Sequence, residues 1–276
     1  MFKKYFRDKT ILVTGASGSI GSEVVNFLLK YNCKVIRALS NDENGLHLLS
    51  QSINSEKNPN FNSHMYKKKI RYIYGDICNE EKCHEAMKGV DVVIHTAALK
   101  HLEICEYNPF DAVNVNVLGT KNLVKAAMAE NISKFLFIST DKVVDSQSVL
   151  GSSKLLAEKI VLNANLVKGK KRTKFSSIRF GNVIGSRGSV LLTFIKQAKN
   201  NENITVSDQN MKRCFVTIQV AVEAILKSIS IMKGAEIFLP KNIVTFNIVD
   251  LAGVIKKLYN SKSKVSFIGK KKGEKM

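Results

Sequence analysis

The stretch Thr14-Gly15-Ala16-Ser17-Gly18-Ser19-Ile20-Gly21 decides the fold. It follows the short β-branched run Thr10–Val13, which predicts a buried strand, and it precedes a segment whose apolar residues fall on one helical face. Glycines at such a turn let the backbone approach a pyrophosphate, and the N-terminus of the following helix presents free N–H groups to it. The pattern predicts a dinucleotide-binding turn, whose expected cofactor contacts are Gly15, Ser17, Gly18, Ser19, Ile20 and Gly21.

Strand and helix patterns alternate along the chain as far as Gly181. Five more short apolar runs predict strands, at Lys34–Leu39, Ile70–Tyr74, Val90–His95, Lys134–Ser139 and Phe175–Phe180. Helical patterns lie between most of them, notably over Val113–Glu130 and Val149–Leu166, whereas the polar segment Ser50–Ser63 predicts a loop. Alternation of this kind implies an α/β fold with a parallel sheet covered on both faces, and six strands suit the doubly wound Rossmann arrangement.

The regular alternation ends after Gly181. The remaining patterns predict helices at Ser189–Asn200, Ile218–Met232 and Ile248–Tyr259, with short strands at Ile204–Val206 and Cys214–Thr217. We therefore expect a dinucleotide-binding Rossmann domain over residues 1–185. Residues 186–276 are expected to form a small C-terminal substrate-binding lobe that shares its core and lies over the carboxyl ends of the sheet.

Composition restricts the classes of function. The chain has 276 residues, a 45% hydrophobic fraction and a net charge of +20. It has no apolar run long enough to cross a bilayer and no secretory leader, so we expect no transmembrane segment and a cytoplasmic location. Its lysine clusters lack interleaved aromatics, which argues against a nucleic-acid partner and leaves a positive field that attracts anionic nucleotides. Five cysteines without a CxxC pair predict neither a disulfide framework nor a metal site.

Residues after the second and third predicted strands bear on the cofactor. An acid there holds a free ribose 2′-hydroxyl, and Asp42 lies near that position, while no arginine follows the strand to bind a 2′-phosphate. This favours NAD over NADP. Asp76 and Ile77 are expected to flank the adenine, although Asp76 could instead be the N-cap of the next helix.

The end of the fourth strand offers further candidates. The small residues Ala97 and Ala98 leave room for the cofactor, and Lys100 lies over the carboxyl end of the sheet, where ligands of such folds bind. His95 is expected to be a packing residue at the strand end.

Several segments carry a family resemblance from about Lys9 to the last residue. The order of glycine turn, Ala97-Ala98, Asn116, Ser139-Thr140 and Lys154 resembles the extended short-chain dehydrogenase/reductases. The finer motifs resemble the UDP-N-acetylglucosamine 4,6-dehydratases, the CapD-like or FlaA1-like polysaccharide biosynthesis group. They are Ala97-Ala98-Leu99-Lys100-His101, Ser139-Thr140-Asp141-Lys142, Arg179-Phe180-Gly181-Asn182-Val183, Gly185-Ser186-Arg187-Gly188-Ser189-Val190, Met211-Lys212-Arg213 and Gly273-Glu274-Lys275.

The resemblance implies a reaction and its catalytic residues. A tightly bound, recycled NAD or NADP takes a hydride from C4 of the sugar, water is lost across C5 and C6, and the hydride returns to C6. Such chemistry needs a base and an acid near one another. The resemblance implies Lys142 as the C5 base, Asp141 as the C6 acid, Thr140 as the partner of the C4 oxygen and Lys154 as the residue on the nicotinamide ribose.

The resemblance also implies further contacts and an assembly. Asn116 is expected among the cofactor contacts, and Lys100 is expected to reach both cofactor and substrate. A UDP-sugar is the implied substrate and a homo-oligomer the implied assembly. The residues expected to hold the UDP-sugar, besides Lys100, are Asn182, Ser186, Arg187 and Arg213.

Two departures from the family pattern leave alternatives open. Leu150 stands where the parent class has a tyrosine that takes the C4 hydroxyl proton, although a subset of the dehydratases has Met there. Thr140 with a water, or Asp141 itself, could replace that tyrosine. Relatives also continue past Gly273-Glu274-Lys275, so a truncated lobe is expected. The competing functions are a UDP-sugar 4-epimerase and a non-catalytic NAD(P)-binding module.

Overall fold

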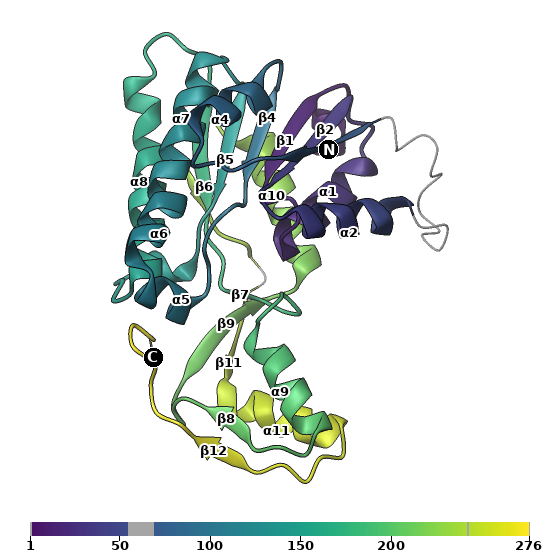
Figure 1. The fold of residues 1–276 in the computed structure, drawn as a ribbon, viewed down its shortest axis with the longest axis vertical. Helices are drawn as coiled ribbons and strands as arrows, with labels where there is room; N and C mark the ends of the chain where they lie inside the picture. Colours follow the sequence, from purple (N-terminus) through teal and green to yellow (C-terminus); the bar gives the residue numbers. More distant parts are fainter. Residues whose placement is uncertain (1, 55–68, 242, 276) are drawn as a thin grey trace.

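A seven-stranded parallel sheet forms the main part of the protein (Figure 1). The computed structural model describes residues 2–54, 69–241 and 243–275. The strand order is β10-β6-β5-β4-β1-β2-β3, which reverses direction between β1 and β4, as in doubly wound folds. The strands are β1 (Thr10–Thr14), β2 (Val35–Ser40), β3 (Ile70–Tyr74), β4 (Val92–His95), β5 (Lys134–Ile138), β6 (Lys174–Ile178) and β10 (Ile237–Phe238).

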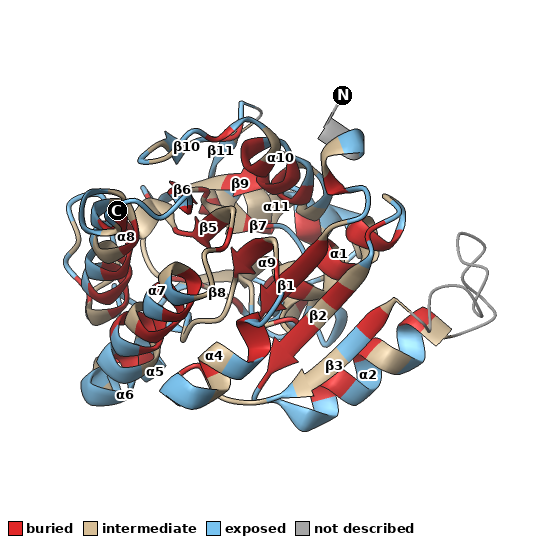
Figure 2. Cartoon of the chain, turned by 90° about the horizontal axis from the view of Figure 1, so that it is seen from above, coloured by how far each residue is buried: buried red, intermediate tan, exposed pale blue. Residues whose placement is uncertain are grey.

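Helices cover both faces of this sheet, so its central strands are buried. In β1, Ile11 and Val13 join one core cluster and Leu12 joins the other, because successive side chains point to opposite faces. Figure 2 shows the buried strands β1 and β2 beside α1, with α4 and α7 on the other side. The helices of this part are α1 (Ser19–Leu29), α2 (Glu43–Asn54), α4 (Glu80–Met87), α5 (Leu102–Tyr107), α6 (Pro109–Val113), α7 (Thr120–Ala129), α8 (Val149–Val167) and α10 (Ile218–Ile231).

A smaller lobe lies beyond the carboxyl ends of the main sheet, below it in Figure 1. Its strands form a three-stranded sheet, β11-β9-β7, and a two-stranded sheet, β12-β8. Its apolar core includes Phe194, Phe215 and Ile248. The lobe's elements are β7 (Asn182–Val183), α9 (Val190–Lys199), β8 (Ile204–Val206), β9 (Lys212–Val216), β11 (Val244–Asn247), α11 (Ile248–Leu258) and β12 (Val265–Phe267).

Short helical turns complete the described chain. A 3₁₀ helix spans Phe2–Phe6, and another, η3, spans Asp141–Val143 directly after β5. A π-helical segment, η2, spans Asn114–Gly119 and joins α6 to α7. None of the helices in the described ranges is both long and apolar enough to cross a membrane.

The doubly wound α/β fold is confirmed, with differences in detail. The chain returns from the lobe to the main sheet, where α10 packs in the core beside β1 and α1, and β10 pairs with β6 as a seventh strand. Two residues, Ile237 and Phe238, are too few for a strand pattern to appear in the sequence. Helix α2 extends to Asn54, so the loop predicted to begin at Ser50 starts later, and residues 55–63 of that prediction lie outside the described residues. The division at residue 185 stays a prediction.

Candidate active site

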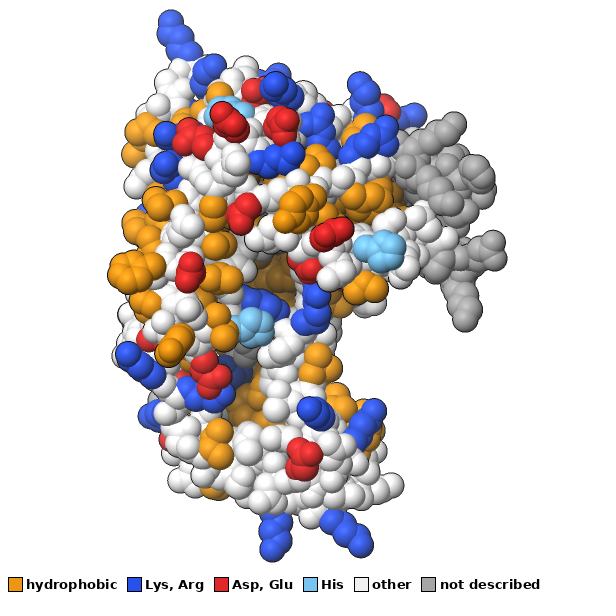
Figure 3. Space-filling model, viewed as in Figure 1, with side chains coloured by type: hydrophobic (Ala, Val, Ile, Leu, Met, Phe, Trp, Pro, Cys, Tyr) orange, Lys and Arg blue, Asp and Glu red, His pale blue; other side chains and the backbone are white. Residues whose placement is uncertain are grey.

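A cavity of about 980 Å³ opens between the carboxyl ends of the main sheet and the lobe. Figure 3 shows the hollow between the two parts, with Lys, Arg and His side chains at its wall. Nearly all the site residues predicted from the sequence line it. They are Gly15, Ser17, Gly18, Ser19, Ile20, Gly21, Asp76, Ile77, Ala97, Ala98, Lys100, Thr140, Asp141, Lys142, Lys154, Asn182, Ser186, Arg187 and Arg213.

Two glycines of the glycine turn, Gly15 and Gly21, have no room for a side chain because backbone atoms lie too close. Gly15 has a φ of +64°, and a Cβ there would lie 2.7 Å from the backbone of Ala97. A Cβ on Gly21 would lie 2.2 Å from the carbonyl oxygen of Gly15. Helix α1 begins after Gly18 with no side-chain cap, which leaves its first N–H groups for a ligand. This cradle of bare backbone at a helix N-terminus fits a dinucleotide pyrophosphate.

The two acids near the expected ribose position lie on the cavity wall. Asp42 Oδ1 accepts a hydrogen bond from the Gly45 amide at 2.8 Å, which caps α2. Asp76 Oδ1 accepts from the Cys78 amide at 2.8 Å, whereas the N-cap of α4 is Asn79. The alternative interpretation of Asp76 as the helix N-cap is therefore wrong, and its carboxylate remains at the cavity.

Lys154 on α8 is a buried lysine at the centre of the site. Its Nζ donates to the carbonyl oxygen of Ile138 at 2.7 Å and lies 3.9 Å from the Phe137 ring centroid. Burial lowers the pKa of Lys154 to about 7, against a smaller opposing effect of Glu158. The buried amine therefore loses its proton at a lower pH than an ordinary lysine does.

His95 packs at the end of β4. It is fully buried, with Nδ1 2.8 Å from Thr14 Oγ1 and Nε2 2.9 Å from Thr120 Oγ1. Burial, and then the charge of Lys154, hold the pKa of His95 well below its usual value. The ring is thus a neutral, hydrogen-bonded core group, as the sequence predicts.

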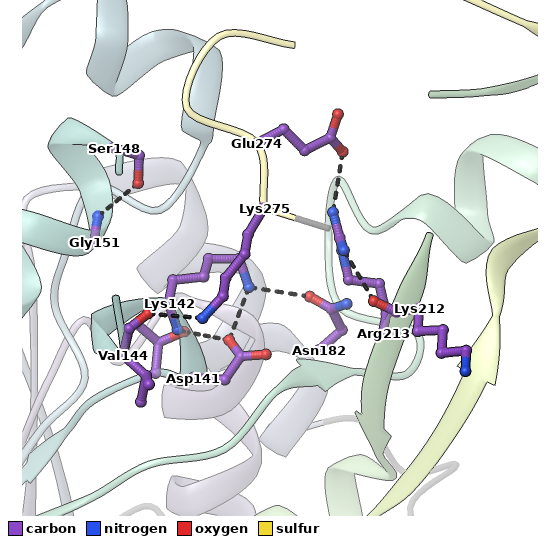
Figure 4. A network of polar contacts seen from close by, with 11 residues as sticks. Asp141, Lys142, Val144, Ser148, Gly151, Asn182, Lys212, Arg213, Glu274 and Lys275 are labelled. Atoms are coloured by element: carbon purple, nitrogen blue, oxygen red, sulfur yellow. Dashed lines mark hydrogen bonds and ion pairs between the residues drawn. The ribbon is translucent and has the colours of Figure 1, made fainter. Parts of the chain in front are cut away.

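An acid and an amine, Asp141 and Lys142, meet directly after β5 (Figure 4). Thr140 caps the short helix η3 that carries them. Thr140 Oγ1 donates to Asp141 Oδ1 at 3.0 Å, and Lys142 Nζ donates to the same oxygen at 3.0 Å. Lys142 Nζ also lies 3.4 Å from Asn182 Oδ1. About a third of each charged side chain is exposed, at 34% for Lys142 and 35% for Asp141. The pair can therefore reach a ligand and deliver or remove protons at adjacent atoms.

Leu150 cannot take part in proton transfer. Its side chain is 4% exposed and packs with Cys105 and Ala112 in a small apolar cluster beside the cavity. The Lys154 amine, one helical turn further along α8, is directed to the Ile138 carbonyl instead. The wall that carries a tyrosine in the parent class is therefore apolar in this protein.

Asn116 is the one predicted site residue that the structure does not bring to the cavity. It is 1% exposed; its Oδ1 accepts from the Leu99 amide at 2.8 Å, and its Nδ2 donates to the Leu99 carbonyl at 3.1 Å and to Ser153 Oγ at 3.0 Å. These bonds occupy the amide group, so its geometry supports positioning of the Leu99-Lys100 loop and not a direct cofactor contact.

The C-terminal tail links the lobe to the main domain across the cavity. Arg213 forms an ion pair with Glu274 at 3.3 Å, and both side chains are about 15% exposed. Next to it, Lys275 Nζ donates to the Val144 carbonyl at 2.9 Å (Figure 4). Arg213 is therefore held at the lobe side of the cavity by a partly buried carboxylate and not by a surface one.

Arg187 does not lie beside Arg213, with which it was predicted to bind the UDP-sugar. Its amide donates to Ser19 Oγ at 3.0 Å, and its guanidinium donates to the Ser17 carbonyl. The structure thus separates two arginines that the sequence analysis assigned to one ligand, since Arg187 contacts the glycine turn and Arg213 contacts the tail.

Sequence reasoning missed a buried ion pair behind the site. Glu158, fully buried on α8, receives two hydrogen bonds from Arg179, at 2.9 Å from Nε and 2.5 Å from an Nη atom. Glu158 follows Lys154 by one helical turn, and that spacing on one face was the available clue. Among the residues that the structure describes, no cluster of acids, histidines and cysteines could hold a metal ion.

The glycine turn, the strand order and the buried lysine together define an extended short-chain dehydrogenase/reductase. A family model described as "Polysaccharide biosynthesis protein" matches residues 11–276, so the chain belongs to that family. This confirms the predicted CapD-like or FlaA1-like resemblance.

Three curated relatives span nearly all of this chain. A protein of Methanocaldococcus jannaschii named "Uncharacterized membrane protein MJ1061" is 44% identical over 99% of this chain and 80% of its own length. A protein named UDP-glucose 4-epimerase from Rickettsia bellii is 36% identical over 98% of this chain and 76% of its own length. Staphylococcus aureus CapD, a capsular polysaccharide biosynthesis protein, is 35% identical, and the whole of this chain matches 45% of CapD.

Solved structures support the same fold. Pen from Bacillus thuringiensis superimposes with a TM-score of 0.90 at 39% identity, over 100% of this chain and 82% of Pen. The dTDP-glucose 4,6-dehydratase DesIV from Streptomyces venezuelae, solved with NAD, gives a TM-score of 0.83 at 19% identity, over 96% of this chain and 86% of DesIV. The second likeness shows the fold alone.

Proposed function

We propose that this protein is a UDP-N-acetylglucosamine 4,6-dehydratase that makes a UDP-4-keto-6-deoxy sugar for polysaccharide or glycan biosynthesis. The observation that carries the proposal is the Asp141–Lys142 pair, 3.0 Å apart at the wall of a cavity that also contains the glycine turn. A neighbouring acid and base at a hydride-transfer site are what an elimination of water next to a new ketone requires.

The proposed roles of the residues are those that the family resemblance implies, and the position of these residues around one cavity supports them. A bound NAD would supply the hydride chemistry, with removal from C4 and return to C6. The C4 hydroxyl proton would leave to Asp141 or, through Thr140, to a water, and it balances the proton that Asp141 gives to the C6 hydroxyl. Thr140 holds the C4 oxygen, and Lys154 holds the nicotinamide ribose. Lys142 removes the C5 proton, which the C4 ketone has made acidic, and later returns it. Asp141 protonates the departing C6 hydroxyl, so sugar minus water is the net product.

A UDP-sugar 4-epimerase is the second candidate, since a relative 36% identical carries that name. It would use the same cofactor and C4 oxidation, but it needs no acid at C6. A non-catalytic dinucleotide-binding module is the third candidate. Leu150 supports it, whereas the hydrogen-bonded Thr140, Asp141 and Lys142, with Lys154 on the same cavity, oppose it.

One incubation separates these functions. The purified protein is given UDP-N-acetylglucosamine and catalytic NAD, and the nucleotide sugar is analysed by mass spectrometry. Loss of one water without net cofactor reduction supports the dehydratase. An unchanged mass with altered chromatographic mobility identifies an epimerase, and an unchanged substrate beside bound cofactor identifies a binding module.

The acids at the adenosine end lead us to propose NAD as the preferred cofactor. Asp42 and Asp76 place carboxylates at the cavity where a 2′-phosphate would add negative charge. We expect NAD to bind at least about tenfold more tightly than NADP in calorimetric titrations. Asp42→Asn keeps a good helix cap but removes one charge, so it should narrow that gap. Equal affinities, or tighter NADP binding, would contradict this assignment.

We also propose a homo-oligomer assembled through α5 and α6. Tyr107 and Phe110 on these helices are 87% and 89% exposed, which is unusual for large apolar side chains that have no partner. Phe110→Glu should then shift the protein to a smaller species in light scattering after gel filtration. An unchanged mass for the variant, or a monomeric wild type, would refute this interface.

The five free thiols favour a reducing compartment, and we propose the cytoplasm as the site of the reaction.

A further inference from the structure

We propose that Arg187 and Lys100 form a clasp beside the glycine turn and that this clasp helps to hold the pyrophosphate of the bound dinucleotide. The proposal rests on the proposed function only in that a dinucleotide occupies the cavity. It does not depend on which sugar reacts.

The first observation is the path of the segment between β7 and α9. From the lobe strand β7 it crosses to the main domain, where the Arg187 amide donates to Ser19 Oγ at 3.0 Å. The guanidinium donates to the Ser17 carbonyl. Both acceptors belong to the glycine turn and the first residue of α1. The charged end of Arg187 therefore lies against the backbone that fits a pyrophosphate.

The second observation is the uncompensated charge at this place. Lys100 Nζ donates to the carbonyl oxygen of Arg187 at 2.8 Å, so the lysine lies against the arginine's backbone. Burial, followed by the nearby charge of Arg187, lowers the pKa of Lys100. Across the described ranges, neither residue is in an ion pair with a carboxylate. Both exposed cations line the cavity beside the N-terminus of α1, so their charges are available to an anion bound there.

The third observation distinguishes the cofactor from the UDP-sugar as the anion. Arg213, at the lobe side, already has Glu274 as a partner, and it contacts the tail. The Arg187 amide and guanidinium both donate to the turn at which α1 begins, the end of the cavity that fits the cofactor. A diphosphate held by the free N–H groups of α1 is thus the anion within reach of this guanidinium.

The clasp is fixed to the lobe and to the Lys100 loop together. Gly188 has a φ of +70°, and a Cβ there would lie 2.5 Å from His101 Cε1. The segment therefore packs without a side chain against the residue next to Lys100. A dehydratase returns the same hydride that it took, so its cofactor must not leave between the two transfers. A clasp from the lobe supplies that retention, mainly by slowing dissociation.

The test compares two arginines at opposite ends of one cavity. NAD, ADP-ribose, adenosine and UDP are titrated separately into wild type, Arg187→Ala, Arg187→Lys and Arg213→Ala. For Arg187→Ala we expect about tenfold weaker NAD and ADP-ribose binding, and faster NAD dissociation, because a charge-assisted contact to phosphate is lost. Adenosine and UDP affinities should stay within about twofold. Arg187→Lys should recover part of the loss, and Arg213→Ala should weaken UDP and spare NAD.

Two results would overturn the clasp. Weaker UDP binding with unchanged NAD binding in Arg187→Ala would show that Arg187 binds the UDP-sugar and not the cofactor. Equal losses for NAD and for adenosine, which has no phosphate, would reveal a structural effect only. None of these titrations requires turnover. A negative product assay therefore does not contradict the clasp, and a negative titration result does not contradict the dehydratase.

Discussion

We expect the replacement of Asp141 by asparagine to abolish the proposed dehydration while the cofactor still binds. The carboxyl group is the proposed proton donor to the C6 hydroxyl, and an amide of the same shape has no proton to deliver. We expect turnover to fall by about 10²–10⁴-fold, the usual contribution of a general acid. The variant keeps its hydrogen-bond acceptor toward Thr140 and Lys142, so the fold and the NAD affinity should be unchanged. Product formation by mass spectrometry gives the first readout.

A second readout shows which step the variant blocks. If Asp141 acts only at C6, a single turnover of Asp141→Asn leaves reduced cofactor, seen as lasting absorbance near 340 nm. If no reduced cofactor forms, Asp141 also receives the C4 hydroxyl proton through Thr140, in place of the tyrosine for which Leu150 stands. The exposed Asp8→Asn gives a matched control with normal turnover. Normal turnover in Asp141→Asn would remove Asp141 from the mechanism.

We expect the replacement of Glu158 by alanine to destabilise the folded protein by about 3 kcal/mol, because it leaves Arg179, whose side chain is only 22% exposed, without its buried partner. Urea unfolding measures the effect. Glu80→Ala, which breaks the exposed Glu80–Lys125 pair, is the matched control and should cost no more than about 1 kcal/mol. Removing both charges with Glu158→Leu and Arg179→Met should recover much of the loss. A loss for Glu158→Ala as small as that of the control would contradict a buried ion pair.

The same pair predicts a pH dependence. Burial alone would raise the pKa of Glu158, but hydrogen bonds from Arg179 and its charge outweigh burial and hold that pKa below its ordinary value. A carboxyl group whose pKa is lowered in the folded state stabilises the folded protein at pH values above its unfolded pKa of about 4.3. That stabilisation is lost as the pH falls through the lower folded pKa. The difference in free energy of unfolding between wild type and Glu158→Ala should therefore be largest at pH 6 and become smaller below about pH 4.

The sequence predicted the parts of the fold that depend on neighbours in the chain. Six strands, the helices between them and the glycine turn follow from periodicity and from backbone sterics within a few residues. Thr140, Asp141 and Lys142 are also neighbours in the sequence. In the structure, Thr140 Oγ1 and Lys142 Nζ each lie 3.0 Å from Asp141 Oδ1. The seventh strand escaped because Ile237 and Phe238 form a strand only beside β6.

Only the tertiary structure decided the contacts between distant segments of the chain. Asn116 turns inward to the Leu99 backbone, Glu158 meets Arg179, and Arg187 reaches the glycine turn about 170 residues earlier in the chain. Local patterns give the type of a residue and the element that carries it. The direction and partner of its side chain depend on how whole elements pack. The sequence by itself thus determined a dinucleotide-binding doubly wound fold with an acid–amine pair after its fifth strand, whereas packing decided which charged groups face which ligand.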